Sequence, residues 1–584
     1  MRSPITISCG NTTHSTASTP KQAKTKRKTL YGTFARHFNG DWGLGIGDWV
    51  EQHFLKGSPS YYAGEVGGFQ TDFYIAGGKE TEIFEPRFTY NGFKYLEIKG
   101  LSEAPVPDDF TACELSSGFP QTGVFMTSNS LINQIQAATL SSYRSNFVDG
   151  YPTDCPHREK NGWTGDAQLA CELGMFNWEN SAAYEKWARD LLDEQQPDGN
   201  LPGIVPTGGW GYAWGNGPAW DSALVLIPWH LYVYRGDRRI LEKSYQGMKC
   251  YVDYMTSRED ADHLVSHGLG DWCSWDKMPP TQVTVSSYYY VDAKIVAATA
   301  RLLGKVDEAE KYEALAARIQ ADYNRTLLDQ ATGTYSDGSI TAQACPIHQG
   351  ITDALSKEEQ QAVFARLLDR LAEVDYHFDC GIFGVKYVLR TLSEGGRTDL
   401  ALRMVLQETP PCYAAWIRHG EGTLWEDWQD GSSRNHIMFG DISAWFYQYL
   451  AGIRLDGAPY PAAGNEPEAL AFQQFLIAPD CRKSDLAVPG KESISSASAY
   501  VDTPNGRIVS SWERDTETRR LTLCVDIPCN THAKIFVPFD EGEEVIPDEN
   551  IPDPIRTEAR KVTDRGKDAV LYQVGSGKYR FTVK

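Results

Sequence analysis

The chain has 584 residues, of which 41% are hydrophobic and 23% charged, and this composition predicts a folded globular protein of several domains. Its formal net charge of −21 excludes nucleic acid as a partner and disfavours anionic membrane surfaces, because both attract Lys and Arg. The 12 cysteines show no metal-binding spacing, so neither a metal nor another cofactor is expected.

Residues 1–30 are rich in Ser and Thr, end in a basic run, and are predicted to form a disordered leader. This leader contains no apolar segment typical of a secretion signal, and no later segment is long enough to span a bilayer. A cytoplasmic location is therefore expected, although a truncated start would leave a periplasmic or secreted location open.

Residues 31–124 contain short stretches in which apolar and polar side chains alternate, such as 88–90 and 93–98. Alternation bounded by Asn-Gly and Lys-Gly pairs is typical of strands and hairpins. This segment is predicted to be a partial β-sandwich.

Residues 125–455 change to the periodicity of amphipathic helices. Roughly ten to twelve such helices, joined by loops rich in Gly, Pro and Trp, predict an (α/α)6 barrel. The clearest helical runs cover residues 131–147, 182–192, 220–234, 241–255, 291–303, 306–327, 357–374, 382–392, 400–406 and 442–453.

Residues 456–584 return to strand patterns separated by turn signals, and they predict a C-terminal β-sandwich. The expected strands cover residues 498–501, 508–512, 521–527, 533–537 and 579–583. The predicted architecture is therefore multidomain, with a helical barrel between two β-sandwich regions.

One loop of the barrel segment carries three acidic residues, Asp154, Glu159 and Asp166, around Trp163. Pro and Gly residues break this stretch, so it is predicted to be a loop, and Asp166 is expected in the first turn of the helix that follows. Carboxyl groups held close together favour protonation of one of them near neutral pH. A protonated carboxylic acid beside a flat apolar ring is what hydrolysis of a sugar–oxygen bond requires.

A second acidic cluster lies far downstream, where Glu426 and Asp427 stand between Trp425 and Trp428, and His436 follows. Glycoside hydrolysis uses two carboxyl groups, so the two loops offer a matched pair from distant parts of the chain. The alternative for either loop alone is a solvated surface loop anchored by its tryptophans. Two loops of the same kind on one helical scaffold favour the catalytic interpretation.

These motifs resemble the bacterial α-L-rhamnosidases of glycoside hydrolase family 78. The similarity rests on the Asp-Cys-Pro-x-Arg-Glu-x-x-Gly-Trp-x-Gly-Asp run at 154–166, on Thr-Leu-Trp-Glu-Asp-Trp at 423–428 and on Ser-x-Asn-His at 433–436. Supporting segments at 84–93, 196–199 and 270–272 keep the same order along the chain. Members of the family pair an (α/α)6 catalytic barrel with β-sandwich domains, which agrees with the layout above.

The resemblance implies an exo-acting α-L-rhamnosidase that releases terminal rhamnose with inversion. It implies that Glu159 is the general acid and Glu426 the general base. It further implies that rhamnose is bound by Asp154, Asp166, Trp163, Trp220, Trp272 and His436, with Arg158 orienting the acids. A deoxy sugar whose C6 is a methyl group needs both apolar walls and hydroxyl acceptors, and these residue types supply them.

Several roles have a structural alternative. Trp220 stands near a predicted helix start and is equally suited to a core position, and His436 is equally suited to a structural hydrogen bond. Asp427 competes with Glu426 as the base, and the spacing of the family motif favours Glu426. Cys155 is expected to be a buried packing residue.

The leading alternatives to a rhamnosidase are an inverting (α/α)6 hydrolase of another deoxy sugar or an unsaturated uronide, and a sugar-binding relative without turnover. A uronide enzyme needs a basic patch, which the motif residues lack, and binding alone needs no acid–base pair. The segment ahead of the barrel is shorter than in many family members, so the N-terminal sandwich is expected to be shortened. The expected partner is a carbohydrate substrate, and the sequence does not define the aglycone or the oligomeric state.

Overall fold

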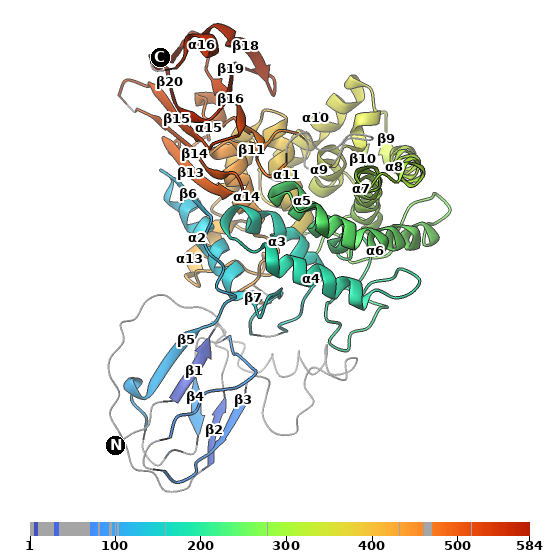
Figure 1. Cartoon of the computed structure of the whole chain (residues 1–584), viewed down its shortest axis with the longest axis vertical. Coiled ribbons are helices and arrows are strands. Elements are labelled where there is room, and N and C mark those ends of the chain that lie inside the picture. The colour runs from blue at the N-terminus through green and yellow to red at the C-terminus, as the bar shows by residue number, and fades with distance from the viewer. Residues whose placement is uncertain are drawn as a thin grey trace.

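The fold is that of a computed structural model of the whole chain (Figure 1). A helical body lies between two small sheets from the N-terminal part of the chain and two larger sheets from the C-terminal part. The structure describes residues 5–9, 29–33, 71–79, 82–92, 96–99, 101, 104–157, 159–276, 278–430, 432–457, 460, 470–515, 517–549 and 551–584, and of β1 and β2 it describes the backbone.

The N-terminal part forms one parallel pair of strands and one three-stranded antiparallel sheet. Strand β1 (Ile5–Cys9) pairs with β5 (Phe110–Glu114), and β2 (Thr29–Thr33) lies between β3 (Thr71–Ile75) and β4 (Glu97–Lys99). Strand β1 lies inside the leader that was predicted to be disordered, so that prediction is wrong for these residues. The rest of the leader before β2 lies outside the described residues. Residues 88–90, predicted as a strand, are not in one.

The helical part alternates buried and amphipathic helices, and none of its described helices is both long and apolar enough to cross a membrane. The buried series is α3 (Thr164–Asn177), α5 (Ala223–Arg235), α7 (Thr281–Leu302), α9 (Ile340–His348), α11 (Ile382–Glu394) and α14 (Ile442–Trp445), which continues as a π-helical turn η3 (Phe446–Leu450). The others are α2 (Ser130–Ser145), α4 (Ser181–Glu194), α6 (Arg238–Ser257), α8 (Val306–Leu327), α10 (Lys357–Glu373), α12 (Thr398–Val405) and α13 (Tyr413–His419).

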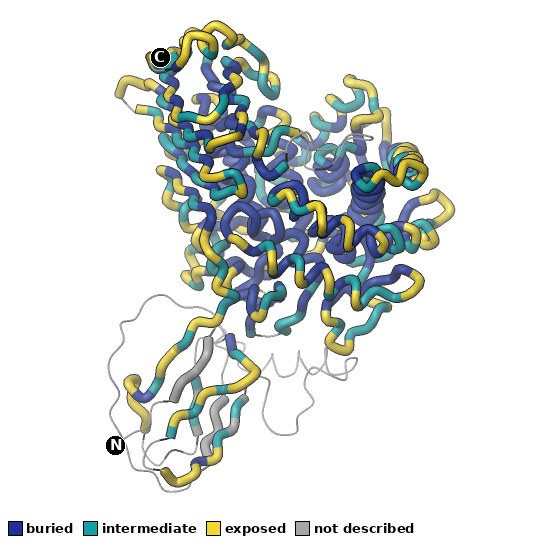
Figure 2. The backbone as a smooth tube through the Cα atoms, in the orientation of Figure 1, coloured by how far each residue is buried: buried dark blue, intermediate teal, exposed yellow. Residues whose placement is uncertain are grey.

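The six buried helices contact one another in a closed order, α3–α5–α7–α9–α11–α14 and back to α3. Their side chains are buried on almost every face, whereas α4, α6, α8 and α10 bury one stripe and expose the other (Figure 2). An amphipathic helix can cover a fully buried helix, because its apolar stripe packs inward while its polar stripe stays in contact with water. The core is therefore a ring of helices wrapped by a second helical layer.

The outer helices carry the start signals that their sequences predict. Ser356 accepts a hydrogen bond from the backbone of Glu359, whose carboxylate accepts one in return from the Ser356 amide, so α10 begins with a complete capping box. Asp237 accepts from the amide of Arg239 at the start of α6. Gly236, between α5 and α6, has a φ of +74°, and this left-handed conformation ends α5.

The C-terminal sheets contain five and six strands. The first has the order β11–β12–β16–β19–β18 and the second β17–β20–β15–β14–β13–β6. Their bounds are β6 (Gly123–Thr127), β11 (Ile453–Leu455), β12 (Gln474–Ile477), β13 (Ser496–Thr503), β14 (Gly506–Arg514), β15 (Leu521–Ile527), β16 (His532–Pro538), β17 (Val545–Pro547), β18 (Arg560–Asp564), β19 (Lys567–Val574) and β20 (Gly577–Val583).

Strand β6 precedes the helices in the chain but is an edge strand of the C-terminal sheet. It pairs antiparallel with β13, with Phe125 opposite Ala499. The predicted limit between sandwich and barrel at residue 124 therefore falls inside a strand that belongs to the other end of the molecule. The five strands predicted between 498 and 583 are each present.

Four buried charged side chains lie where α3, α11 and the start of α14 meet. The guanidinium of Arg390 on α11 lies 2.9 Å from a carboxylate oxygen of Glu172 on α3 and 2.8 Å from one of Asp441, and Lys386 lies 3.3 Å from Asp441. Burial raises the pKa of Glu172, but the cations of Arg390 and Lys386 outweigh it and hold this pKa well below its ordinary value. The buried ion cluster thus links α3 to α11 and to the start of α14.

Replacing Arg390 with Leu should destabilise the fold by about 3–5 kcal/mol, because two buried carboxylates would keep one cation between them. Urea unfolding measures the loss. The matched control is Arg366→Leu, which removes an arginine 2.9 Å from Glu373 at the surface of α10 and should cost less than about 1 kcal/mol. Equal losses for the two variants would contradict the importance of the buried cluster.

Candidate active site

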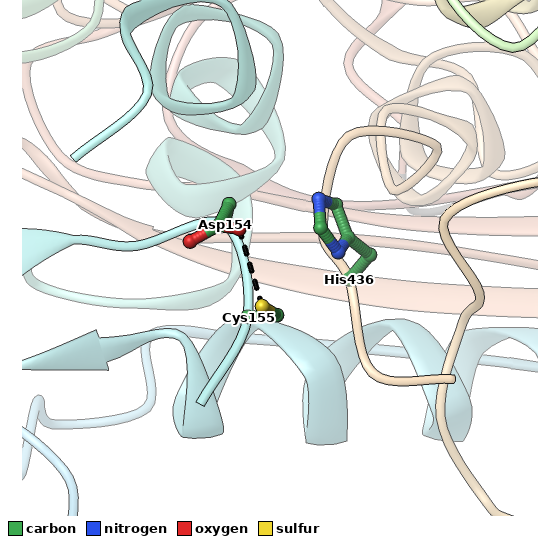
Figure 3. Close-up of side chains that lie close together, drawn as sticks. All are labelled: Asp154, Cys155 and His436. Atoms are coloured by element: carbon green, nitrogen blue, oxygen red, sulfur yellow. Dashed lines mark hydrogen bonds between the residues drawn. The ribbon is translucent and has the colours of Figure 1, made fainter. Parts of the chain in front are cut away.

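The first acidic loop connects β8 (Tyr151–Pro152) to α3 and is closed by its own hydrogen bonds. Asp154 is buried, and its Oδ1 accepts the amide hydrogen of Asn161 at 2.9 Å. Its Oδ2 accepts a hydrogen bond from the thiol of Cys155 at 3.1 Å, drawn as a dashed line in Figure 3. The carboxylate of Asp154 is therefore fixed by the loop that carries it.

Glu159 stands at the turn of the same loop and is half-buried. The indole Nε1 of Trp163 donates a hydrogen bond to its Oε2 at 2.9 Å, and the Glu159 amide donates to the sulfur of Cys155 at 3.4 Å. Cys155 is buried, as predicted, and in addition it connects the backbone of Glu159 to the carboxylate of Asp154. Arg158, predicted to orient the acids, lies outside the described residues.

The second acidic loop folds back on itself like a short hairpin. The amide of Glu426 donates to the carbonyl of Ser433 at 2.8 Å, and the amide of Ser433 donates to Oε2 of Glu426 at 2.9 Å. Glu426 is 7% exposed, whereas Asp427 is less buried and accepts a hydrogen bond from the amide of Gln429 within the turn. Of the two neighbouring acids, Glu426 is the one that the fold holds inside.

His436 lies close to Asp154 and Cys155 of the first acidic loop (Figure 3) and contacts acids from two segments. Its Nε2 lies 3.3 Å from Oδ1 of Asp166, in the first turn of α3, and its Nδ1 lies 3.8 Å from Oε2 of Glu426. Burial lowers the pKa of His436, but the charges of Glu426, Asp166 and Asp154 outweigh burial and raise this pKa to about 9. The ring is therefore an imidazolium at neutral pH, ion-paired to both loops.

The side chains of Asp154, Cys155 and His436 lie with their polar atoms within 4.8 Å of one another (Figure 3). Such a spacing would suit a metal ion, and metal binding would require the release of the thiol hydrogen that Cys155 donates to Asp154.

The end of α2 supports the second loop from behind. Ser142 Oγ accepts the amide hydrogen of Leu424 at 2.8 Å, and Ser145 Oγ donates to the side-chain oxygen of Asn435 at 3.0 Å. The side chain of Asn146 also donates to Asn435, at 3.1 Å. The sequence motif Ser-x-Asn-His includes Asn435, but the sequence does not predict that Asn435 bonds to the end of α2.

Trp272 lies on a third loop and is 37% exposed. The residue before it, Asp271, is fully buried and accepts the amide hydrogens of Gly381 and Phe383, so this loop caps the start of α11. The indole of Trp428, from the second acidic loop, donates to the carbonyl of Cys380 at 2.9 Å. Trp272 and the Glu426 loop are therefore held against the same end of one helix.

Trp220 is 3% exposed and belongs to the hydrophobic core. Its ring lies edge-on to that of Phe383, at 5.3 Å, and a side chain at Gly165 would collide with it. This is the core position that the sequence left open as an alternative. The ring of Trp220 therefore packs against the first turn of α3 at Gly165, the residue before Asp166.

The loop of Glu159 also contacts the N-terminal part of the chain, which the sequence does not predict. The ammonium of Lys160 donates a hydrogen bond to the carbonyl of Tyr90 and lies 4.5 Å from the centre of its ring. A side chain at Gly92 would collide with Pro156 and His157. Burial lowers the pKa of Lys160 to about 8. The 84–92 segment is thus a support for the first acidic loop.

The geometry brings together Asp154, Asp166, Glu426 and His436 directly, and Glu159 through Cys155 and Trp163. One carboxyl group is half-buried at a turn, and the other is buried in a hairpin beside the His436 ring. Two separate carboxyl groups beside indole rings can carry out general acid–base hydrolysis of a glycosidic bond.

Comparison with known families agrees with this chemistry. Residues 120–450 match the model described as the bacterial alpha-L-rhamnosidase 6 hairpin glycosidase domain, which defines a glycoside hydrolase domain. Residues 54–116 match the concanavalin-like domain and 462–551 the C-terminal domain of the same proteins. The chain belongs to the bacterial α-L-rhamnosidase family.

The chain is 31% identical over 546 residues to an alpha-L-rhamnosidase of Formosa agariphila and 29% identical over 527 residues to one of Streptomyces avermitilis. The alignments cover 88% of this chain but 54% and 47% of those relatives, so the chain spans about half their length. The structure of an alpha-L-rhamnosidase from Dictyoglumus thermophilum is similar with a TM-score of 0.81 at 29% identity, over 96% of this chain and 60% of that one. The Streptomyces avermitilis enzyme complexed with L-rhamnose gives 0.77 at 25%, over 96% and 50%.

His436 should make stability depend on pH. Its folded-state pKa of about 9 lies above its ordinary value of 6.5, so protonation stabilises the fold fully below pH 6.5, and this contribution is lost as the pH rises through 9. The contribution corresponds to about 3 kcal/mol. Urea unfolding of the wild type and of His436→Gln should differ most at pH 6.5, and the difference should shrink by about that amount at pH 9.5. A difference that stays constant would contradict the ion pair.

Proposed function

We propose that the protein is an inverting, exo-acting α-L-rhamnosidase in which Glu159 is the general acid and Glu426 the general base. The observation that carries the proposal is the ion pair of His436, which brings the carboxylate of Glu426 to the loop of Glu159 across a long stretch of sequence. Membership in the bacterial α-L-rhamnosidase family supports rhamnose as the sugar.

In the proposed reaction Glu159 gives its proton to the glycosidic oxygen while a water molecule attacks the anomeric carbon from the opposite face. Glu426 takes a proton from that water. The bond from the anomeric carbon to the leaving oxygen breaks, the bond to the water oxygen forms, and the product is β-L-rhamnose. The hydrogen bonds from Trp163 to Glu159 and from Ser433 to Glu426 orient the two carboxyl groups.

The remaining residues bind the sugar in this proposal. Asp154 and Asp166 accept hydrogen bonds from rhamnose hydroxyl groups, and Trp163 and Trp272 cover the apolar ring face and the C6 methyl group. His436 keeps Asp166 and Glu426 in place and neutralises part of their charge. Trp220 packs against Gly165, the residue before Asp166.

The scaffold in this proposal is an (α/α)6 barrel. The closed order of contacts among α3, α5, α7, α9, α11 and α14 supports it, and so does the second helical layer around them. Both acidic loops then open at one end of the barrel, because each is directly followed by a helix of the inner ring.

The test is hydrolysis of an aryl α-L-rhamnopyranoside followed by proton NMR, to identify the anomer that forms first. We expect β-L-rhamnose at early times, followed by mutarotation. First release of α-L-rhamnose would overturn the inverting mechanism. Hydrolysis of the aryl glycoside of another deoxy sugar, but not of the rhamnoside, would overturn the substrate.

Two variants separate the roles of the carboxyl groups. Glu159→Gln should lower kcat by about 10²–10⁴-fold on rhamnosides with alkyl leaving groups and by much less on 2,4-dinitrophenyl rhamnoside, because an acidic leaving group needs little protonation. Glu426→Gln should lower kcat strongly on both substrates. Asp427→Asn is the matched control and should retain activity. Equal losses for Glu159→Gln on both substrates would refute the acid assignment.

A further inference from the structure

Three tryptophans outside the inner helices form one cluster beside Glu159. The ring centre of Trp163 lies 5.9 Å from that of Trp210 and 5.8 Å from that of Trp214, and Trp210 and Trp214 stack at 5.5 Å. Trp163 and Trp210 are half-buried, whereas Trp214 is 50% exposed. A large apolar side chain with half its surface in water, at the edge of a catalytic loop, is a candidate ligand contact.

The loop between α4 and α5 is shaped to hold these rings. Gly215 has a φ of +77°, and a side chain there would approach the ring of Trp163 to 2.8 Å, so only glycine lets the loop lie against that indole. The hydroxyl of Tyr212 donates to the Glu194 carbonyl at the end of α4, at 2.9 Å, and the amide of Gly217 donates to the buried Asp221 at 2.7 Å. Both sides of the segment that carries Trp214 are therefore anchored.

The position of the cluster relative to Glu159 defines what it can contact. A general acid must reach the glycosidic oxygen within hydrogen-bond distance, so the leaving group begins at the carboxyl group of Glu159. Trp163 donates its indole hydrogen to that carboxyl group, and Trp210 and Trp214 are the next rings outward. A leaving group that extends from Glu159 toward solvent along Trp163 therefore meets Trp214.

We infer that Trp210 and Trp214 form the binding surface for the leaving group, and that they favour a neutral leaving group with a flat ring next to the rhamnosyl bond. The 207–217 segment contains aromatic, glycine and small polar residues and no charged side chain, so it suits a neutral ring and not a charged one. An aryl ring and the apolar face of a pyranose share this chemistry. The inference rests on the proposed function, because it takes Glu159 as the acid.

The test compares Trp214→Ala with the wild type on phenyl α-L-rhamnoside, on a rhamnosyl-glucose disaccharide and on methyl α-L-rhamnoside. Loss of a stacking surface should lower kcat/KM by about 5- to 10-fold on a substrate whose ring uses it. Methyl rhamnoside lacks the ring, so its kcat/KM and the inhibition constant of free L-rhamnose should not change. Trp214→Phe should restore most of the loss. The phenyl and disaccharide arms decide between an aryl and a sugar leaving group.

Trp272→Ala is the matched control, since among the described residues it removes the other exposed tryptophan, which the proposed function places against the rhamnose. It should lower kcat/KM alike on all three substrates and weaken inhibition by L-rhamnose. If Trp214→Ala lowered kcat/KM equally on all three, or on none, the inference would be overturned. Equal melting temperatures for wild type and variants exclude misfolding as the cause.

Failure of the proposed function has a different result. If the wild type released rhamnose from none of the three glycosides, titration calorimetry with the same compounds would test the tryptophan surface by itself. Weaker binding of the phenyl glycoside or the disaccharide to Trp214→Ala, with methyl rhamnoside unchanged, would still support it. Equal affinities of wild type and variant for every compound would overturn it.

Discussion

The arrangement of the site depends on one buried cation shared by two carboxylates. Without His436, Asp166 and Glu426 would be two like charges removed from water, and each would favour separation of the loops. With it, the ion pairs at 3.3 and 3.8 Å make the two loops one unit. Glu159 is positioned by extension, because Cys155 links its backbone to Asp154, whose charge also acts on His436. The same principle holds deeper in the ring, where Arg390 joins Glu172 and Asp441.

The sequence singled out the two acidic loops because their residue pattern is local. Acidic residues, prolines, glycines and tryptophans lie close together in 154–166 and 422–436, and all of Asp154, Asp166, Glu426 and His436 meet in the fold. The contacts that support them are not local, and periodicity carries no signal for them. Lys160 reaches Tyr90, and Asn435 reaches the end of α2, through packing alone. The Gly and Trp residues of 207–217 are visible in the sequence, but only the fold shows that Trp214 lies beside Trp163.

The fold was predictable where one face of an element meets water. The helices α2, α4, α6, α8 and α10 and the strands β13, β14, β15, β16 and β20 alternate between buried and exposed residues, and their positions agree with the predicted ranges. Helix α13 and the strands β11, β12, β17, β18 and β19 were not predicted. The fully buried helices are harder, because burial on all sides removes the periodicity. The first half of α7 is rich in β-branched residues and tyrosine, which favour strands, and only the second half of this helix was predicted. Helix α9 contains Pro346 and was not predicted. Trp220 packs in the core, and the sugar-binding role that the resemblance implies for it stays a prediction.

The pairing of β6 with β13 has a consequence for how the chain reaches its native state. Strand β6 is synthesised before every helix of the ring, yet the neighbour that satisfies its backbone appears only after the last of them. Contacts between such distant segments form late and slowly, because a long loop must close first. During synthesis this edge remains unpaired, and an unpaired apolar edge is a template for aggregation. A fragment that contains the helical ring alone would therefore separate β6 from β13, and each of these strands would lose the other as its neighbour.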